Sequence, residues 1–303
     1  MDHGALSAQG IALTVRQRQL LHFAGGCLAL AGMVYVGIRL HVYWSGLSSL
    51  SLSLLSWSGI VGLAMFYGGA NAFLAIAWWL LLRHHKESRP LSLTIKVFGI
   101  SQLAKYVPGN VAHFAGRQAL GMSYNMAGGP VAKSLIWELA LLTLAAAQFG
   151  WMAIATVTPH ISHYAGISFF CASFITTSYI CWRLFGRDIT RSFVCEVLFF
   201  FASALVFASL AFIMLETKEL PLSHFPSIGG AFILAWLAGF ITPGAPAGIG
   251  VREGVLLFLL EGLAPETELL LLVLLSRLVS VLGDLLFFLI ALISPTTPLT
   301  ANE

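Results

Sequence analysis

Residues 105–118 read KYVPGNVAHFAGRQ and residues 243–254 read PGAPAGIGVREG, and both stretches interrupt sequence that is otherwise apolar enough for a bilayer interior. Each stretch contains a Pro-Gly pair and, nine residues after the proline, an arginine: Pro108, Gly109 and Arg117, then Pro243, Gly244 and Arg252. Irregular backbone survives at membrane depth only where protein or a water-filled cavity covers it. The repeated break therefore predicts a duplicated membrane unit, and broken segments in matching places of two halves point to a transporter's binding site.

The composition places the chain among integral membrane proteins before any motif is considered. Of its 303 residues, 58% are hydrophobic and only 10% are charged. At about 20 residues per crossing, this length accommodates roughly six to eight spans. No polar stretch is long enough to fold as a separate soluble domain. We therefore expect one transmembrane domain at residues 20–293, between tails at residues 1–19 and 294–303.

Six continuous apolar segments predict full crossings, at residues 20–43, 57–82, 131–157, 165–184, 192–215 and 269–293. Between them lie two interrupted regions, residues 91–122 and 228–263, each made of two pieces that are too short to cross comfortably. Such pieces are typical of re-entrant segments. Two complete extra crossings per region are the alternative, and the pattern leaves it open. The predicted fold is an all-α polytopic membrane protein with about six full transmembrane helices and two Pro-Gly-broken re-entrant hairpins.

The distribution of lysine and arginine predicts the orientation, because the cytoplasmic flanks of membrane helices collect these residues. Three basic clusters fall on one side if each interrupted region enters and leaves by the same face: Arg16 and Arg18; Arg83, Lys86 and Arg89; Arg183, Arg187 and Arg191. The opposite loops contribute only Lys218. We therefore expect both termini to face the cytoplasm.

The same layout makes the two halves of the chain, residues 20–157 and 165–293, run in opposite directions across the membrane. Pro108 then corresponds to Pro243, and Glu138 corresponds to Arg277, with a difference in offset that fits a four-residue change in loop length. The prediction is an inverted repeat. This architecture favours alternating access about a site near the membrane midplane.

The strings KYVPGNVAHFAGR and PGAPAGIGVREG resemble the signature pair of the lysylphosphatidylglycerol synthase transmembrane-region family. That family of flippase-like membrane proteins includes the flippase half of the bacterial multiple peptide resistance factor. The resemblance implies a lipid flippase or flippase-like transporter of the bacterial inner membrane, acting on a phospholipid or polyprenyl-linked lipid with an anionic or modified headgroup. Aminoacyl transfer is not expected, because the sequence up to Glu303 leaves no room for the soluble synthase domain of the fused members.

The residues of the two breaks suit an anionic headgroup. Glycines permit turns that a side chain forbids, and prolines leave backbone groups unpaired. The expected hinge residues are Pro108, Gly109, Pro243, Gly244, Gly248 and Gly250. Arginine offers a bidentate fork for phosphate, and half-helix N-termini add partial positive charge. The expected headgroup-binding residues are Arg117, Arg252, Lys105, His113, Asn110 and Arg277.

Each of these residues also has a structural interpretation. Either arginine can snorkel to an interface or pair with a carboxylate, Lys105 can snorkel from the end of a short helix, and His113 can be satisfied by local backbone. No metal site or cofactor is expected, since the histidines at 160 and 163 lack a third ligand.

Three carboxylates, Glu138, Asp284 and Glu253, are the expected coupling or ion-pair residues, because ionisable residues in membrane spans usually face the bundle interior. A structural pair between Glu138 and Arg277 and a proton-coupled or substrate-coupled role are the two alternatives. Glu253 is expected to partner Arg252 or its own helix N-terminus.

The expected partner is a membrane lipid with an anionic headgroup, and no nucleic acid is expected. Two other classes of function stay open. One is a membrane-embedded transferase acting on a lipid-linked donor, with its base among Glu138, His113 and Asp284. The other is a non-catalytic partner of an envelope-lipid synthase or glycosyltransferase. A transporter is favoured over an enzyme, because the sequence carries no recognisable nucleotide or metal motif.

Overall fold

The computed structural model describes residues 16, 19–20, 54–106, 112–158, 160, 162–214, 221–242 and 250–295. Within these residues the regular structure is entirely helical. Six helical segments are long and apolar enough to cross a membrane, which confirms the all-α polytopic membrane fold. They are Ser56–His84, Gly128–Val157, His163–Phe185, Arg187–Met214, Leu222–Ile241 and Glu266–Ile293.

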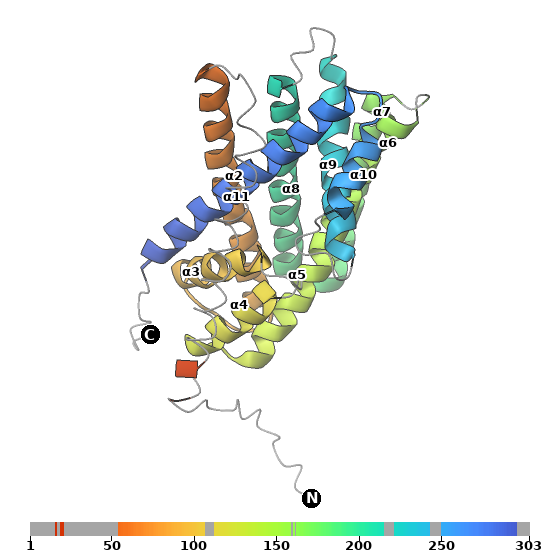
Figure 1. Cartoon of the computed structure of the whole chain (residues 1–303). Coiled ribbons are helices and arrows are strands. Elements are labelled where there is room, and N and C mark those ends of the chain that lie inside the picture. Colours follow the sequence, from red (N-terminus) through yellow and green to blue (C-terminus); the bar gives the residue numbers. More distant parts are fainter. Residues whose placement is uncertain are drawn as a thin grey trace, which may run out of the picture.

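The helices follow one another with few connecting residues (Figure 1). The longer ones are α2 (Leu54–His84), α5 (Gly128–Gln148), α7 (His163–Phe185), α8 (Arg187–Met214), α9 (Phe225–Ile241) and α11 (Glu266–Ile293). The shorter ones are α3 (Leu91–Gln102), the 3-10 turn η1 (Leu103–Tyr106), α4 (Ala112–Ser123), α6 (Gly150–Val157), the 3-10 turn η2 (Leu222–His224) and α10 (Val251–Leu259).

Five of the predicted crossings coincide with candidate spans to within a few residues at each end. The remaining predicted crossing, the first along the chain at residues 20–43, lies outside the described residues except for Leu20. The segment Leu222–Ile241 corrects the interpretation of the second interrupted region, whose first piece was expected to be too short to cross. Pro226 lies in the first turn of α9, where its missing N–H has no helical partner to lose, so the helix starts before the expected residue 228.

The two Pro-Gly pairs fall between helices, at residues 107–111 and 243–249, which lie outside the described residues. Before the first break, α3 contains 12 residues and is therefore about 18 Å long. This is well short of the roughly 30 Å hydrocarbon core of a bilayer. The re-entrant path itself stays a prediction.

The order of elements repeats along the chain, which agrees with the predicted repeat. A long helix, a helix before the break, a short helix after it and another long helix occur as α2, α3, α4 and α5, and again as α8, α9, α10 and α11. The leading helices α2 and α8 are antiparallel, because Arg83 near the end of α2 lies 4.0 Å from Asp188 at the start of α8. In Figure 1, α3 and α4 lie at the lower end of the bundle, while α9 descends from the upper end. These directions fit an inverted arrangement.

The two halves meet where α2 crosses α11, at Gly68 and Gly283. A Cβ added to Gly283 would lie 2.8 Å from both the carbonyl oxygen of Ala64 and the amide nitrogen of Gly68. Only hydrogen at this position allows the two backbones to approach so closely. The crossing lies next to Tyr67 and Asp284 and so fixes the relative position of these two side chains.

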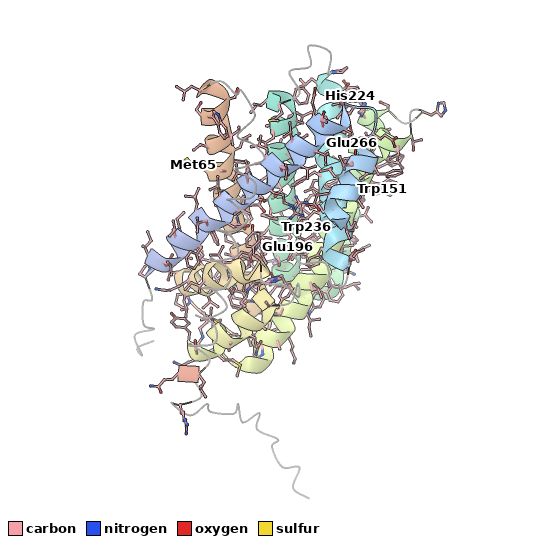
Figure 2. All side chains as sticks on the ribbon, in the orientation of Figure 1. Met65, Trp151, Glu196, His224, Trp236 and Glu266 are labelled. Atoms are coloured by element: carbon pink, nitrogen blue, oxygen red, sulfur yellow. The ribbon has the colours of Figure 1, made fainter. Side chains whose placement is uncertain are left out.

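The outer surface of the bundle is apolar. Large exposed hydrophobic side chains project from the outward faces, including Met65 on α2, Trp151 on α6 and Phe258 on α10. Figure 2 shows Met65 and Trp151 pointing away from the interior. Inside, the indole N–H of the fully buried Trp78 donates to the hydroxyl of Ser134 at 2.9 Å, which ties α2 to α5. A surface of this kind is suited to lipid.

Candidate functional site: a charged cavity at mid-depth

A cavity lies near the middle of the long helices. Its wall includes one residue close to the midpoint of each of four elements: Tyr67 of α2, Glu138 of α5, Phe199 of α8 and Ser280 of α11. Its volume is about 110 Å³, counted as the space open to the centre of a water molecule. One water needs about 10 to 15 Å³ of such space, so the cavity has room for several waters or for a phosphate group.

Both interrupted regions reach this cavity. The first contributes Gln102, Lys105 and His113, and the second contributes Trp236 and Arg252. Figure 2 shows Trp236 inside the bundle, about midway between its two ends. The helices that flank the two breaks therefore contribute side chains to one cavity.

Arg252 lies in the first turn of α10 and lines the cavity. The chain enters this helix through Gly250, a predicted hinge residue whose φ of 86° lies in the left-handed region that favours glycine. The guanidinium lies over the ring of Phe232, 4.3 Å from its centroid, and the residue is 8% exposed. Within the described residues it has neither an ion pair nor a hydrogen bond. Arg252 is therefore a buried cation that faces the cavity without an anionic partner.

The neighbouring carboxylate, Glu253, neutralises Arg277 instead. Its Oε1 accepts from Nη2 of Arg277 at 2.7 Å and from Nε at 2.9 Å. Its Oε2 accepts from the backbone amide of Gly250 at 2.6 Å. The expectation that Glu253 caps its own helix N-terminus is confirmed, whereas its cationic partner is Arg277 and not Arg252.

Asp284 of α11 also lines the cavity and contacts the two residues that precede the first break, Lys105 and Tyr106. Its Oδ2 lies 2.7 Å from the ammonium of Lys105 and accepts a hydrogen bond from the hydroxyl of Tyr106. Its Oδ1 has no hydrogen-bond partner among the described residues. Lys105 is thus neutralised, while one buried acceptor of the cavity wall stays available.

The equivalent arginine of the first half, Arg117, is in a different situation. It is fully buried and forms an ion pair with Glu138, and its Nε donates to the hydroxyl of Ser101 at 3.3 Å. Its guanidinium also lies 4.0 Å from the centroid of the Phe98 ring. Glu138 lines the cavity but Arg117 does not, so Arg117 lies behind the wall.

The structure brings together most of the expected site. The cavity wall contains Lys105, His113, Glu138, Arg252, Arg277 and Asp284. One expectation needs correction, because Arg117 does not face the cavity, and of the two alternatives for Glu138 the pair with Arg277 is not formed. The physical reason is that the short helix after each break supplies the partner, Arg117 from α4 for Glu138 and Glu253 from α10 for Arg277. Asn110 and the hinge residues Pro108, Gly109, Pro243, Gly244 and Gly248 lie outside the described residues.

Some residues of this region were not among the predicted ones. Tyr67, Tyr106 and Gln102 line the cavity but carry no sequence signal that separates them from ordinary interior residues. Glu196 of α8 had a signal, because it is a lone carboxylate within an apolar run. In the part of the chain that the structure describes, no group of three or more histidines, cysteines or carboxylates is placed to hold a metal ion.

The arrangement can attract and hold an anion. The cavity presents one uncompensated guanidinium, a paired guanidinium and a paired ammonium, and it is lined by aromatic rings that keep these charges away from lipid. Charge-assisted hydrogen bonds from arginine are well suited to phosphate. The resemblance to the lysylphosphatidylglycerol synthase transmembrane-region family stays a prediction. No protein-family model, curated protein or solved structure matches this chain.

Proposed function

We propose that the protein is a lipid flippase or flippase-like transporter that binds the phosphate of a lipid headgroup in the mid-depth cavity, while the acyl or prenyl chains stay in the bilayer. Arg252 is the main phosphate ligand. The observation that carries this proposal is its guanidinium, which is buried, faces the cavity and lacks an anionic partner in the described residues.

An arginine in this position favours an anion, because a charged side chain in the membrane interior is costly unless it is paired or faces a hydrated cavity. The adjacent carboxylate, Glu253, is engaged with Arg277, and Asp284 of the cavity wall is engaged with Lys105. An anionic ligand can therefore supply negative charge beside Arg252. The apolar outer surface allows a lipid to keep its chains in the bilayer while its headgroup occupies the cavity.

A lipid-translocation assay tests this function directly. Purified protein is reconstituted in phosphatidylcholine vesicles that contain a trace of a fluorescent phosphatidylglycerol, phosphatidylcholine or polyprenyl phosphate, and dithionite then quenches the outer leaflet. We expect faster exchange of a phosphate-bearing probe than in vesicles without protein. Arg252→Gln removes this acceleration, whereas Arg191→Gln, at an exposed position of α8, retains it. Equal exchange by wild type and Arg252→Gln, or no acceleration for any probe, would contradict the proposal.

The orientation belongs to the same proposal: both termini face the cytoplasm of a bacterial inner membrane, and the two breaks enter from opposite faces. The ion contact between Arg83 and Asp188 supports it, because it places the basic clusters that follow α2 and precede α8 at the same end of the bundle. Cysteines introduced at Ser88 and Ser223, in a chain whose native cysteines are replaced, test it with impermeant maleimide. Labelling of both from the same side would contradict the inverted arrangement.

A membrane-embedded transferase is the second candidate, and His113 is the observation in its favour. This residue lines the cavity, and its Nδ1 is buried without a hydrogen-bond partner in the described residues. A neutral imidazole in such a place can act as a base. Release of a product from a lipid-linked donor by purified protein, lost in His113→Gln, would favour this function over transport.

A further inference from the structure

Glu196 is a fully buried carboxyl group on α8 that the proposed headgroup site does not use. It lies within the candidate span Arg187–Met214, and its side chain has no exposed surface. Figure 2 shows Glu196 inside the bundle, away from the helix ends. It precedes Phe199, which lines the cavity, by one helical turn on the same face. Glu196 therefore lies next to the cavity wall.

Neither carboxyl oxygen of Glu196 has a hydrogen-bond partner in the described part of the chain, and the residue forms no ion pair there. The hydroxyl of Ser192 lies close to Glu196 along the helix, but it donates its one proton to the carbonyl oxygen of Ala77 at 3.1 Å. An isolated carboxylate is strongly disfavoured away from water, and it is relieved by a proton or by a compensating cation. Among the described residues, none forms an ion pair with Glu196.

The charged and titratable groups on the elements packed against α8 leave Glu196 unpaired. Glu138 of α5 acts on it with like charge, and Cys181 of α7 lies nearby. Three other charged groups on neighbouring helices have partners: Arg83 of α2 with Asp188, and Arg277 and Asp284 of α11 with Glu253 and Lys105. Lys133 of α5, Arg183 of α7 and Glu266 of α11 are exposed on the surface. Helix α9 carries no charged residue, and Cys195 is adjacent on α8 itself. Glu138 is thus the group through which Glu196 is connected to the cavity.

The charges around the cavity do not cancel. Its described members are four cations, Lys105, Arg117, Arg252 and Arg277, and three carboxylates, Glu138, Glu253 and Asp284. One positive charge is left over. An ionised Glu196 brings this cluster to neutrality, whereas a protonated Glu196 leaves the charge of Arg252 available for an anion.

We infer that Glu196 is a proton-binding site that couples proton uptake to the binding of an anionic headgroup at Arg252. The inference rests on the proposed function and adds its energy source, a proton gradient. When the anion enters, one proton from water forms an O–H bond with the Glu196 carboxylate, by way of the Glu138 carboxylate that lines the cavity. When the anion leaves, this O–H bond breaks and the proton returns to water, so that charge and atoms balance over the cycle.

Calorimetric titration measures this coupling without a transport assay. Dihexanoyl-phosphatidylglycerol, a water-soluble phosphodiester, is titrated into purified protein in buffers of different ionisation enthalpy, at several values between about pH 6 and pH 9. The dependence of the heat on the buffer gives the number of protons taken up. We expect wild-type uptake to approach about one proton per bound anion at the alkaline end and to fall toward zero at the acid end.

The variants separate Glu196 from other proton sources. The glutamine in Glu196→Gln cannot ionise. We therefore expect this variant to bind the probe at every pH without the proton uptake that wild type shows. Glu261→Gln, at an exposed position after α10, behaves like wild type. Wild-type binding without proton uptake at any pH, or the same uptake in Glu196→Gln as in wild type, overturns the inference.

Two further outcomes are distinguishable. If Glu196→Gln does not fold, Glu196→Asp retains the carboxyl group, and loss of proton uptake in this variant while it still binds the probe overturns the inference. If wild type does not bind the probe at all, the proposed headgroup site fails, and the inference fails with it. Binding of the probe together with zero uptake leaves the proposed function standing and removes only the role of Glu196.

Discussion

The two interrupted regions carry an arginine at the same distance from their Pro-Gly breaks but place it in opposite electrostatic situations. Arg117 is sealed behind the cavity wall and paired with Glu138, whereas Arg252 faces the cavity without a carboxylate in the described residues. The difference originates in the following long helix, which has a glutamate at 138 in the first half and an arginine at 277 in the second. Two breaks with the same spacing thus lead to one structural ion pair and one candidate binding site.

The comparison predicts its largest effect at Arg117. In Arg117→Gln the buried Glu138 loses its cation, and breaking a buried pair in this way costs about 3 to 5 kcal/mol of stability. Thermal unfolding of the purified variant in detergent measures this loss. The double variant Arg117→Gln with Glu138→Gln, which removes both charges, is expected to recover part of it. A variant as stable as wild type would show that the pair does not hold the first half together.

Arg252→Gln is expected to affect ligand binding more than stability, because no carboxylate among the described residues loses its partner when this charge is removed. We expect a change in unfolding temperature much smaller than that of Arg117→Gln. Loss of a hydrogen bond to a charged ligand costs about 1.5 to 3 kcal/mol, so the affinity for a soluble phosphodiester is expected to fall about tenfold to a hundredfold. Equal loss of stability in the two arginine variants would remove the distinction between the halves.

The sequence predicts the features that depend on neighbouring residues, but it does not predict the contacts between helices that are far apart along the chain. Apolar runs specified most of the crossings, because the thickness of the bilayer sets the length of a span. The Pro-Gly pairs drew attention to two arginines, of which Arg252 lines the candidate cavity and Arg117 does not. Ion pairing was not predictable, since the positions of α4 and α10 against α5 and α11 decide whether Glu138 meets Arg117 or Arg277. Glu196 was overlooked because one carboxylate hardly changes the hydropathy of a long span, although its isolation is itself a signal.

The next largest effect on stability is expected at the crossing of α2 and α11. Gly283→Ala places a methyl group against the backbone of α2, and overpacking of this kind costs about 1 to 3 kcal/mol. Gly69→Ala is the matched control, because a Cβ there meets no atom within 4 Å. Unfolding measurements on the two variants test the close crossing of α2 and α11. The same stability for both would mean that the helices lie farther apart.

The smallest effect is expected for Glu253→Gln, which removes the carboxylate partner of Arg277 and raises the net positive charge beside the cavity by one. The pair is partly exposed, with 25% of the Glu253 side chain accessible, so its loss costs about 1 kcal/mol or less. Phosphodiester affinity is expected to rise, by up to about fivefold. Titration with the same short-chain lipid checks the direction, and a fall in affinity would indicate that Glu253 itself holds Arg252 in place.

The most direct test of the central claim is an electron cryomicroscopy structure of the protein in nanodiscs rich in phosphatidylglycerol. The account predicts density for a phosphate in the mid-depth cavity, about 2.7 to 3.2 Å from the guanidinium of Arg252, with Arg117 still paired to Glu138. Lipid density confined to the outer surface, with only water beside Arg252, would contradict it.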